Sequence, residues 1–161
     1  MKYIVRQAKL LLIAALSITA ILLVTSRNTT PLSPTSFQIK RLQEKFFMKL
    51  KQSPQEKLEY YTFLLNERLN DLSVVAKDDD SSYILTTSLR YSTTAGQMTN
   101  LIKDNGLKNQ IPNVLTLFQN HRESISTLVE LYPKDFSEDW KFLQDDINYL
   151  NIYSSILSQL K

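Results

Sequence analysis

The stretch SPQEKLEYYTFLLNERLNDLSVVA, residues 53–76, decides the fold class that we predict for this chain. It opens with a helix start signal, since Ser53 can cap the helix, Pro54 needs no donor in the first turn, and Glu56 can complete a capping box. The apolar residues that follow recur at spacings of three and four, which places them on one helix face. They are Leu58, Tyr61, Leu65, Leu69, Leu72 and Val75 or Ala76. The stretch therefore predicts a long helix with one buried face.

Two other segments carry the same periodicity. A helix that begins near Ser36 has its apolar positions at Ile39, Leu42, Phe46 and Leu50. The segment 109–132, which Pro133 closes, has its apolar positions at Ile111, Val114, Phe118, Ile125, Leu128 and Tyr132. We expect both helices to pack through these faces.

Residues 81–105 fit two secondary structures. A strand is suggested by Thr-rich sequence and by apolar residues at odd positions, namely Tyr83, Leu85, Leu89 and Tyr91. A helical stripe covers more turns, with members at Ile84, Tyr91, Ala95, Met98 and Ile102. The pair Asn105-Gly106 then supplies a helix stop. We therefore expect a helix here.

The last helix is predicted to begin at a second capping box, residues 135–138, and it is apolar around much of its circumference. One stripe is Phe136, Trp140, Leu143, Ile147, Leu150 and Leu157, and the other is Phe142, Tyr149, Tyr153, Ile156 and Leu160. Such a helix is normally central or lies at an interface. Tyr149, Tyr153 and Ile156 are thus candidate partner-binding residues, with core packing as the competing interpretation. The same helix would also suit a homo-oligomer.

Taken together, these segments predict an all-α domain over residues 36–161, a bundle of about five helices joined by short turns. The preceding residues 26–35 are rich in Ser, Thr and Pro, which favours an extended linker.

The run LLLIAALSITAILLV, residues 10–24, precedes that linker and follows Lys2, Arg6 and Lys9 without an acidic residue. Its apolar members include Leu10, Leu11, Leu12, Ile13, Ile18, Ile21, Leu22, Leu23 and Val24. As a helix the run reaches roughly 24 Å, short for a bilayer core of about 30 Å. It is also slightly long for a signal-peptide core of about 7–15 residues.

Two outcomes of this run remain open. One is an uncleaved single-pass anchor in the cell membrane, with the N-terminus inside and the domain outside, as the positive-inside rule directs. The other is a signal peptide cleaved near Ser26, which would leave a secreted or periplasmic protein.

Composition narrows the function classes. The chain has no Cys, which excludes disulfides, Cys-ligated zinc and thiol catalysis. Four of its 19 basic residues lie within residues 1–27, which leaves 15 basic against 16 acidic residues in the domain. A domain so close to neutral lacks the electrostatic footprint of a nucleic-acid binder, so we predict no nucleic-acid partner.

Few residues suggest chemistry, and we predict no catalytic residue, metal or cofactor. His121 is the only histidine, and we expect a histidine at the stripe edge that a carboxylate or a backbone carbonyl satisfies, rather than a general base. The acidic run 78–80 lacks the ligand spacing of a calcium loop. The adjacent pairs Glu138-Asp139 and Asp145-Asp146 are expected on solvated faces.

Charge is unevenly distributed along the domain. Residues 40–57 carry a net charge of +4 and residues 122–146 a net charge of −4. A basic amphipathic helix shortly after a membrane segment can lie on anionic lipid or wall polymer. The candidate residues for that contact are Lys40, Arg41, Lys45, Lys49 and Lys51. A packed helix with a solvated basic face is the competing interpretation.

The start of the domain resembles an uncharacterised family of exported bacterial helical domains. The residues that carry the resemblance, over roughly 31–75, are Ser33-Pro34, Phe37, Lys40-Arg41-Leu42 with Glu44, Ser53-Pro54 with Lys57, and Arg68-Leu69. One extra residue separates Pro34 from Phe37, and Ser53 stands where the family commonly has Asp. The resemblance implies an exported helical domain, and it transfers no catalytic residue.

The sequence therefore predicts a noncatalytic, membrane-tethered extracytoplasmic domain that binds a protein or an envelope component. The alternative is a secreted domain, released by signal cleavage, that binds anionic lipid or wall polymer through its basic helix. A hydrolase or transferase is the opposing class.

Overall fold

The structure is a computed structural model that describes residues 31–78, 81–134 and 137–160. Within these ranges it has α2 (Pro34–Leu50), α3 (Pro54–Val75), α4 (Ile84–Asp104), α5 (Ile111–Leu131) and α6 (Trp140–Ser158). Short 3₁₀ turns, η1 (Ser81–Tyr83) and η2 (Lys108–Gln110), precede α4 and α5. The described residues contain no strand, which confirms the predicted all-α class and the helix at 81–105.

The predicted membrane segment, residues 10–24, lies outside the described residues. Among the helices that are described, none combines the length and the apolar character that a bilayer span requires.

The chain divides into two compact units, residues 1–47 and residues 48–161. Most of α2 belongs to the first unit. Its predicted apolar face is largely in contact with solvent, since Leu42 is 67% and Phe46 59% exposed. Phe37 and Lys40, which share a different face of α2, are buried. The face that the spacing predicted as packed is therefore the exposed one.

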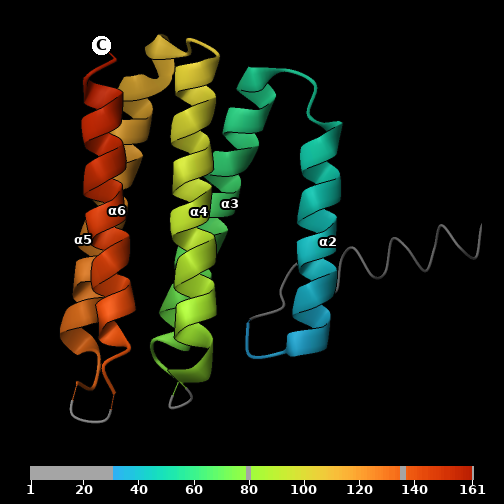
Figure 1. Ribbon diagram of the computed structural model, residues 1–161. Coiled ribbons are helices and arrows are strands. Elements are labelled where there is room, and N and C mark those ends of the chain that lie inside the picture. The colour runs from blue at the N-terminus through green and yellow to red at the C-terminus, as the bar shows by residue number, and fades with distance from the viewer. Residues whose placement is uncertain (1–30, 79–80, 135–136, 161) are drawn as a thin grey trace, which may run out of the picture. The chain divides into compact units, whose positions relative to one another are not determined.

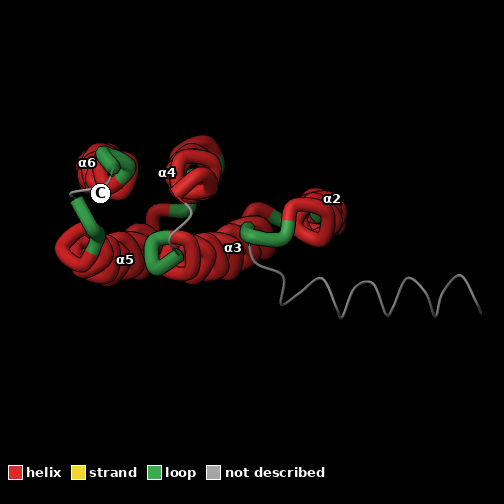
Figure 2. Tube along the Cα trace, turned by 90° about the horizontal axis from the view of Figure 1, so that it is seen from below, coloured by secondary structure: helices red, strands yellow, loops and turns green. Residues whose placement is uncertain are grey.

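The second unit is a bundle built from α3, α4, α5 and α6. Successive helices run in alternating directions (Figure 1). Seen from the end, α4 and α6 form one layer, and α3 and α5 form the other (Figure 2). The closest-packed neighbours are α3 with α4, α5 with α6, and α4 with α6. Helix α4 therefore packs extensively against helices of both layers.

The core of the bundle lies where the predicted stripes converge. Its fully buried apolar side chains include Leu65, Leu72, Met98, Ile102, Phe118, Ile125, Leu143, Leu150 and Leu157. Each fully buried Leu, Ile or Phe side chain stabilises the fold by about 1.5–3 kcal/mol relative to exposure. On α6 only the first predicted stripe reaches this core.

The helix ends follow the predicted signals with two differences. Ser53 Oγ accepts a hydrogen bond from the Glu56 N–H at 3.1 Å, as a cap should. The Glu56 carboxylate accepts from the Gln52 N–H at 2.9 Å rather than from Ser53. The last helix begins at Trp140, later than predicted, and Ser137 instead accepts from the Asp139 N–H in the preceding turn.

Glycine is required where α4 approaches α6. A Cβ atom at Gly96 would lie 2.8 Å from Tyr153 Oη and 3.1 Å from Tyr153 Cζ. The first distance is shorter than real Cβ contacts allow. The absence of a side chain at position 96 therefore lets the Tyr153 ring pack directly on the α4 backbone.

We expect Gly96→Ala to lower the free energy of unfolding by about 1–2 kcal/mol, because overpacking outweighs the helix propensity that alanine gains. In a Tyr153→Phe background the nearest atom is gone, so the same substitution should cost less, although ring carbon Cζ remains 3.1 Å from the added Cβ. Urea unfolding of the four proteins measures the coupling free energy, expected to be about 1 kcal/mol or more. Tyr149→Phe, one turn earlier on α6, is the control background and should leave the cost of Gly96→Ala unchanged. Strict additivity between Gly96→Ala and Tyr153→Phe would contradict the contact.

Candidate functional site

A chain of polar groups runs through His121 on α5, from the exposed Asn66 on α3 to the buried Tyr91 on α4. The Tyr91 hydroxyl lies 3.0 Å from His121 Nδ1, and His121 Nε2 lies 3.0 Å from Asn66 Oδ1. Asn66 also donates from Nδ2 to the Thr62 carbonyl at 2.9 Å, which leaves its Oδ1 as the acceptor. The His121 tautomer follows, because Nε2–H must donate to Asn66 and Nδ1 must accept from Tyr91.

Burial shifts the pKa of both His121 and Tyr91. It lowers the pKa of His121 to about 4, so the imidazole is neutral at physiological pH. It is also the largest cause that raises the pKa of Tyr91, with the charge of Asp146 acting in the same direction. Both imidazole nitrogens already hold protein partners, and the side chain is 3% exposed. His121 is satisfied, as predicted, but by a phenol and an amide rather than by a carboxylate or a carbonyl.

Asp146 on α6 is the second buried titratable group, and its position corrects the prediction of a solvated face. The residue is 1% exposed, and its Oδ2 has no hydrogen-bond partner. Burial raises the pKa of Asp146 to about 8, with the hydrogen bond to Ser88 acting in the opposite direction. The carboxyl is therefore largely neutral at pH 7, because an unpaired buried carboxylate is costly. Its neighbour Asp145 is exposed, as predicted.

A third polar cluster joins α3 to α4. Arg90 Nη1 lies 3.9 Å from Asp71 Oδ2, and both side chains are largely buried. Arg68, one turn before Asp71, donates from Nη1 to the Leu64 carbonyl at 3.1 Å. The Arg90–Asp71 ion pair joins α3 to α4 in the interior, whereas the Arg68 hydrogen bond stays within α3.

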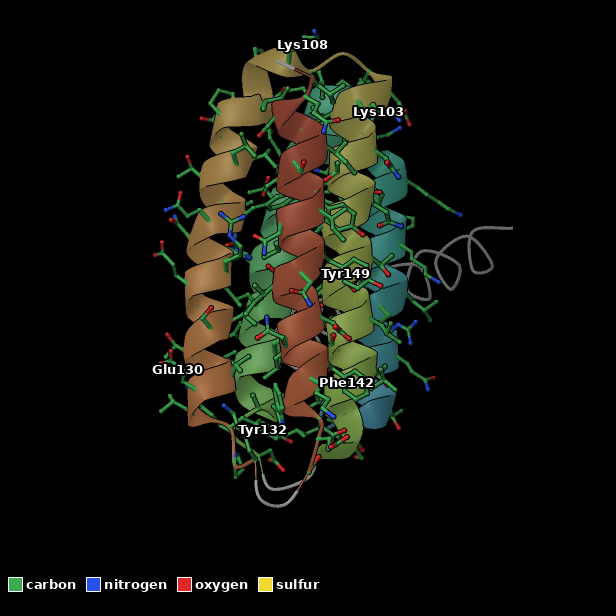
Figure 3. The ribbon with its side chains drawn as sticks, turned by 60° about the vertical axis from the view of Figure 1, so that its left-hand side comes forward. Lys103, Lys108, Glu130, Tyr132, Phe142 and Tyr149 are labelled. Atoms are coloured by element: carbon green, nitrogen blue, oxygen red, sulfur yellow. The ribbon has the colours of Figure 1, made fainter. Side chains whose placement is uncertain are left out.

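Large apolar side chains line the seam between α4 and α6 on the surface of the bundle. Leu85, Leu89 and Gly96 share one stripe of α4, and the Tyr153 contact shows that this stripe faces α6. Tyr149 and Tyr153 stack with ring centroids 6.1 Å apart. We call the apolar residues of this seam the α4–α6 face: Leu85, Leu89, Tyr149, Ile152, Tyr153 and Ile156. Tyr149 lies about half-way along α6 (Figure 3).

The three predicted partner-binding residues all belong to this face. Tyr149 is 44% exposed, and Tyr153 and Ile156 are half-buried. The competing interpretation, packing in the core, does not hold for Tyr149. The structure adds Leu85 and Leu89 from α4, which the sequence could not assign to the same surface.

The five predicted surface-binding basic residues do not form one surface. Arg41, Lys45 and Lys49 are exposed, whereas Lys40 is buried and Lys51 is half-buried with Nζ 5.5 Å from the Tyr60 ring centroid. Lys40 lies three positions after the buried Phe37 and about 100° around the helix from Arg41, so the two basic side chains point to different sides of α2. Lys51 lies beyond the end of α2 at Leu50.

Three surface cavities differ in chemistry. One of about 310 Å³ lies between α3 and α5 and is lined by amide, hydroxyl and aliphatic side chains with one carboxylate, Glu59. Another of about 530 Å³, along α5, holds Arg122 with Glu123 and Glu130. A third of about 470 Å³ includes Lys49, Lys51 and Lys57 but only one acidic residue, Asp104. Within the described residues, no group of His, Cys, Asp and Glu could hold a metal ion.

Sequence reasoning missed the burial of Asp146, the polar role of Tyr91 and the pairing of exposed Asn66 with His121. The available signal was weak, because Asp146 falls between the two apolar stripes of α6 and Tyr91 was counted only as an apolar position. No family model matches the chain, no curated protein matches it significantly, and no solved structure does so either.

The two buried titratable groups predict an unusual pH dependence of stability. Between about pH 4 and 8 folded Asp146 holds a proton that the unfolded chain releases, so the free energy of unfolding falls as pH rises. Between pH 4 and 6.5 the unfolded His121 binds a proton that the folded imidazole does not, which has the opposite sign. The two contributions cancel up to about pH 6.5. The Asp146 contribution then lowers stability by roughly 2 kcal/mol towards pH 8.

Asp146→Asn should remove this decline above pH 6.5 and expose the His121 contribution, so that stability rises by roughly 3 kcal/mol between pH 4 and 6.5. Urea unfolding from pH 4 to 8.5 measures both limbs. Asp145→Asn, which removes the exposed neighbouring carboxylate, should keep the decline. A decline that survives in Asp146→Asn would show that Asp146 is ionised in the fold.

His121→Gln should produce the complementary profile. Without the imidazole, the loss of stability with rising pH should begin near pH 4 rather than near 6.5, because only the Asp146 contribution remains. The slope is the readout, since loss of the Tyr91 hydrogen bond will lower stability at every pH. An unchanged slope between pH 4 and 6.5 would mean that His121 titrates normally.

Proposed function

We propose that this chain is a noncatalytic helical domain, tethered to a membrane by its N-terminal segment and held outside the cytoplasm, that binds a protein. The α4–α6 face is the observation that carries the proposal. It presents exposed aliphatic and aromatic side chains, with Leu89 56% and Tyr149 44% exposed. The N-terminal run 10–24 and its basic flank support the tether and its orientation.

The composition of the α4–α6 face is typical of a protein interface. The cores of such interfaces are depleted of charge and enriched in Tyr and other aromatic residues. On α6 the polar neighbours Asn148, Asn151 and Ser155 are uncharged, and the exposed acid Asp145 lies one turn before Tyr149, at the edge of the face. The partner that fits is therefore a protein with a mainly apolar surface, because a charged group placed against the apolar side chains would lose hydration without gaining a counter-charge.

Packing holds two of the aromatic side chains of the face in place, which lowers the entropic cost of binding. The Tyr153 hydroxyl end packs against the α4 backbone at Gly96, and the Tyr149 ring stacks on Tyr153. The Ser88 hydroxyl donates to the Phe142 carbonyl at 3.1 Å and links the same two helices. Tyr149 is the side chain best placed to act as an anchor.

The buried titratable groups favour a role without chemistry. His121 has both nitrogens occupied by Tyr91 and Asn66, and Asp146 is enclosed between α4 and α6. A general acid or base must reach a substrate within hydrogen-bond distance. Neither group lines any of the three cavities described above.

The test begins with a photo-reactive side chain at Ile152 in the full chain in cells, which should crosslink a defined partner protein. With that partner purified, Tyr149→Ala should weaken binding by about 30-fold, as expected for an interface anchor. Titration calorimetry measures the affinity. Ser124→Ala, on the exposed side of α5, is the control and should leave the affinity unchanged. Equal crosslinking from position 124, or a Tyr149→Ala variant that binds normally, would rule out this face.

A second candidate function rests on α2. Its exposed apolar residues Leu42, Phe46 and Leu50 run parallel to an exposed basic stripe of Arg41, Lys45 and Lys49. The two stripes repeat every four residues and so occupy adjacent faces. Apolar insertion beside cationic groups is the chemistry by which a helix lies on an anionic membrane.

Co-sedimentation of residues 28–161 with vesicles tests this candidate, since the fragment keeps every described residue. It should bind anionic vesicles and not neutral ones. Arg41→Gln with Lys45→Gln should weaken binding by about tenfold or more. Lys103→Gln with Lys108→Gln makes the same charge change on the bundle and should have little effect. Equal affinity for neutral and anionic vesicles would exclude the surface-binding role.

A further inference from the structure

The cavity of about 470 Å³ lies in the second unit, where α4 ends and α3 begins. Lys49 and Lys51 reach it from the chain before α3, Lys57 and Tyr61 from the first turns of α3, and Asn100 from the last turns of α4. Lys103 and Lys108 are at the same end of the bundle but are not among its lining residues (Figure 3). The cavity shares no residue with the α4–α6 face.

Positive charge in this cavity is only partly neutralised by the protein. Three lysines line it against a single carboxylate, Asp104. Across the part of the chain that the structure describes, none of the three forms an ion pair with an acidic side chain. Lys51 is held in place by the Tyr60 ring, 5.5 Å from Nζ. Three ammonium groups gathered around one space repel one another, and a bound anion would relieve that repulsion.

Neutral hydrogen-bond donors complete the lining. The Tyr61 hydroxyl stays protonated, because burial raises its pKa. Gln97 and Asn100 both line the cavity, and neither amide has a hydrogen bond to another described residue. Amide and phenol donors together with ammonium groups match an anion that has several acceptor oxygens.

We propose that this cavity is a binding site for a phosphate group, carried by a phosphate ester. A phosphate offers more acceptor oxygens than a carboxylate and at least one full negative charge, which matches three cations and three neutral donors. Lys57 is the principal contact, since it is fixed on α3 and half-buried, and Tyr61 one turn later supplies the neutral donor. The proposal rests neither on a protein partner at the α4–α6 face nor on α2 lying on a membrane.

The test uses the full chain in an uncharged detergent and follows the backbone and side-chain amide resonances around Gln97 and Asn100. Inorganic phosphate, glycerol phosphate and detergent micelles doped with phosphatidylglycerol are titrated separately at constant ionic strength, with chloride as the matched anion. We expect phosphate-bearing probes to shift these resonances in a saturable way and chloride to leave them unchanged. Saturation by the soluble probes identifies a soluble ester, and saturation by doped micelles alone identifies a lipid head group.

Lys57→Gln should weaken the phosphate affinity by about tenfold, and Tyr61→Phe by a smaller factor. Lys108→Gln is the matched control, because it removes the same charge at the same end of the bundle without touching the cavity. If Lys57→Gln fails to fold, the comparison of Tyr61→Phe with wild type decides the question, since the ring is retained. The proposal would be overturned if Lys57→Gln and Lys108→Gln lost phosphate affinity equally. It would also be overturned if Tyr61→Phe and Lys57→Gln both bound phosphate as wild type does, or if no phosphate probe gave a saturable shift.

Discussion

The packing of α4 against both α3 and α6 is the constraint on which the bundle depends. On its α6 side the contact is close, because Gly96 has no side chain and the Tyr153 ring occupies that space. Ser88 adds a hydrogen bond to the Phe142 carbonyl at the other end of the same contact. On the α3 side, Arg90 and Asp71 meet in the interior. Loss of this packing would therefore disrupt both the α4–α6 face and the hydrogen bonds among Asn66, His121 and Tyr91.

Buried polar groups give this small core its specificity. An apolar core of Leu and Ile tolerates many arrangements of similar energy, whereas the Asn66–His121–Tyr91 chain can be satisfied in only one register of α3, α4 and α5. The cost is that the imidazole must stay neutral. Asp146 makes the opposite demand, since it must hold its proton. Both groups thus stabilise the fold only in their uncharged forms, which are the forms that a low-dielectric interior favours.

The surfaces divide into chemically distinct regions. The α4–α6 face is apolar, with one exposed acid, Asp145, at its edge, whereas the cavity beside the start of α3 has three lysines against one carboxylate, Asp104. The exposed faces of α2 combine both properties on one helix. The α4–α6 face shares no residue with the other two regions, whereas Lys49 belongs both to the basic stripe of α2 and to the cavity. Surface regions of this kind support the proposal that the domain acts by binding other molecules.

By itself the sequence determined the helical class, the existence of all five described helices and the starts and ends of most of them. Ser53, Pro54, Asn105 and Gly106 act within a few residues of chain, and apolar spacing reports directly on which face of a helix is buried. The core stripe of α6 followed for the same reason. The start of α6 did not, because Ser137 and Glu138, the described part of the predicted capping box, lie outside the helix, which begins at Trp140.

Only the tertiary structure decided which polar residues are buried and which apolar residues are exposed. Asp146 reads as a surface acid until α4 covers it, and Leu42 with Phe46 reads as a packed face although both are exposed. Tyr91 and His121 are 30 positions apart in the sequence, and Asn66 and His121 are 55 positions apart. Periodicity describes one helix at a time, whereas burial, pKa shifts and shared surfaces arise from the neighbours that each helix acquires on folding.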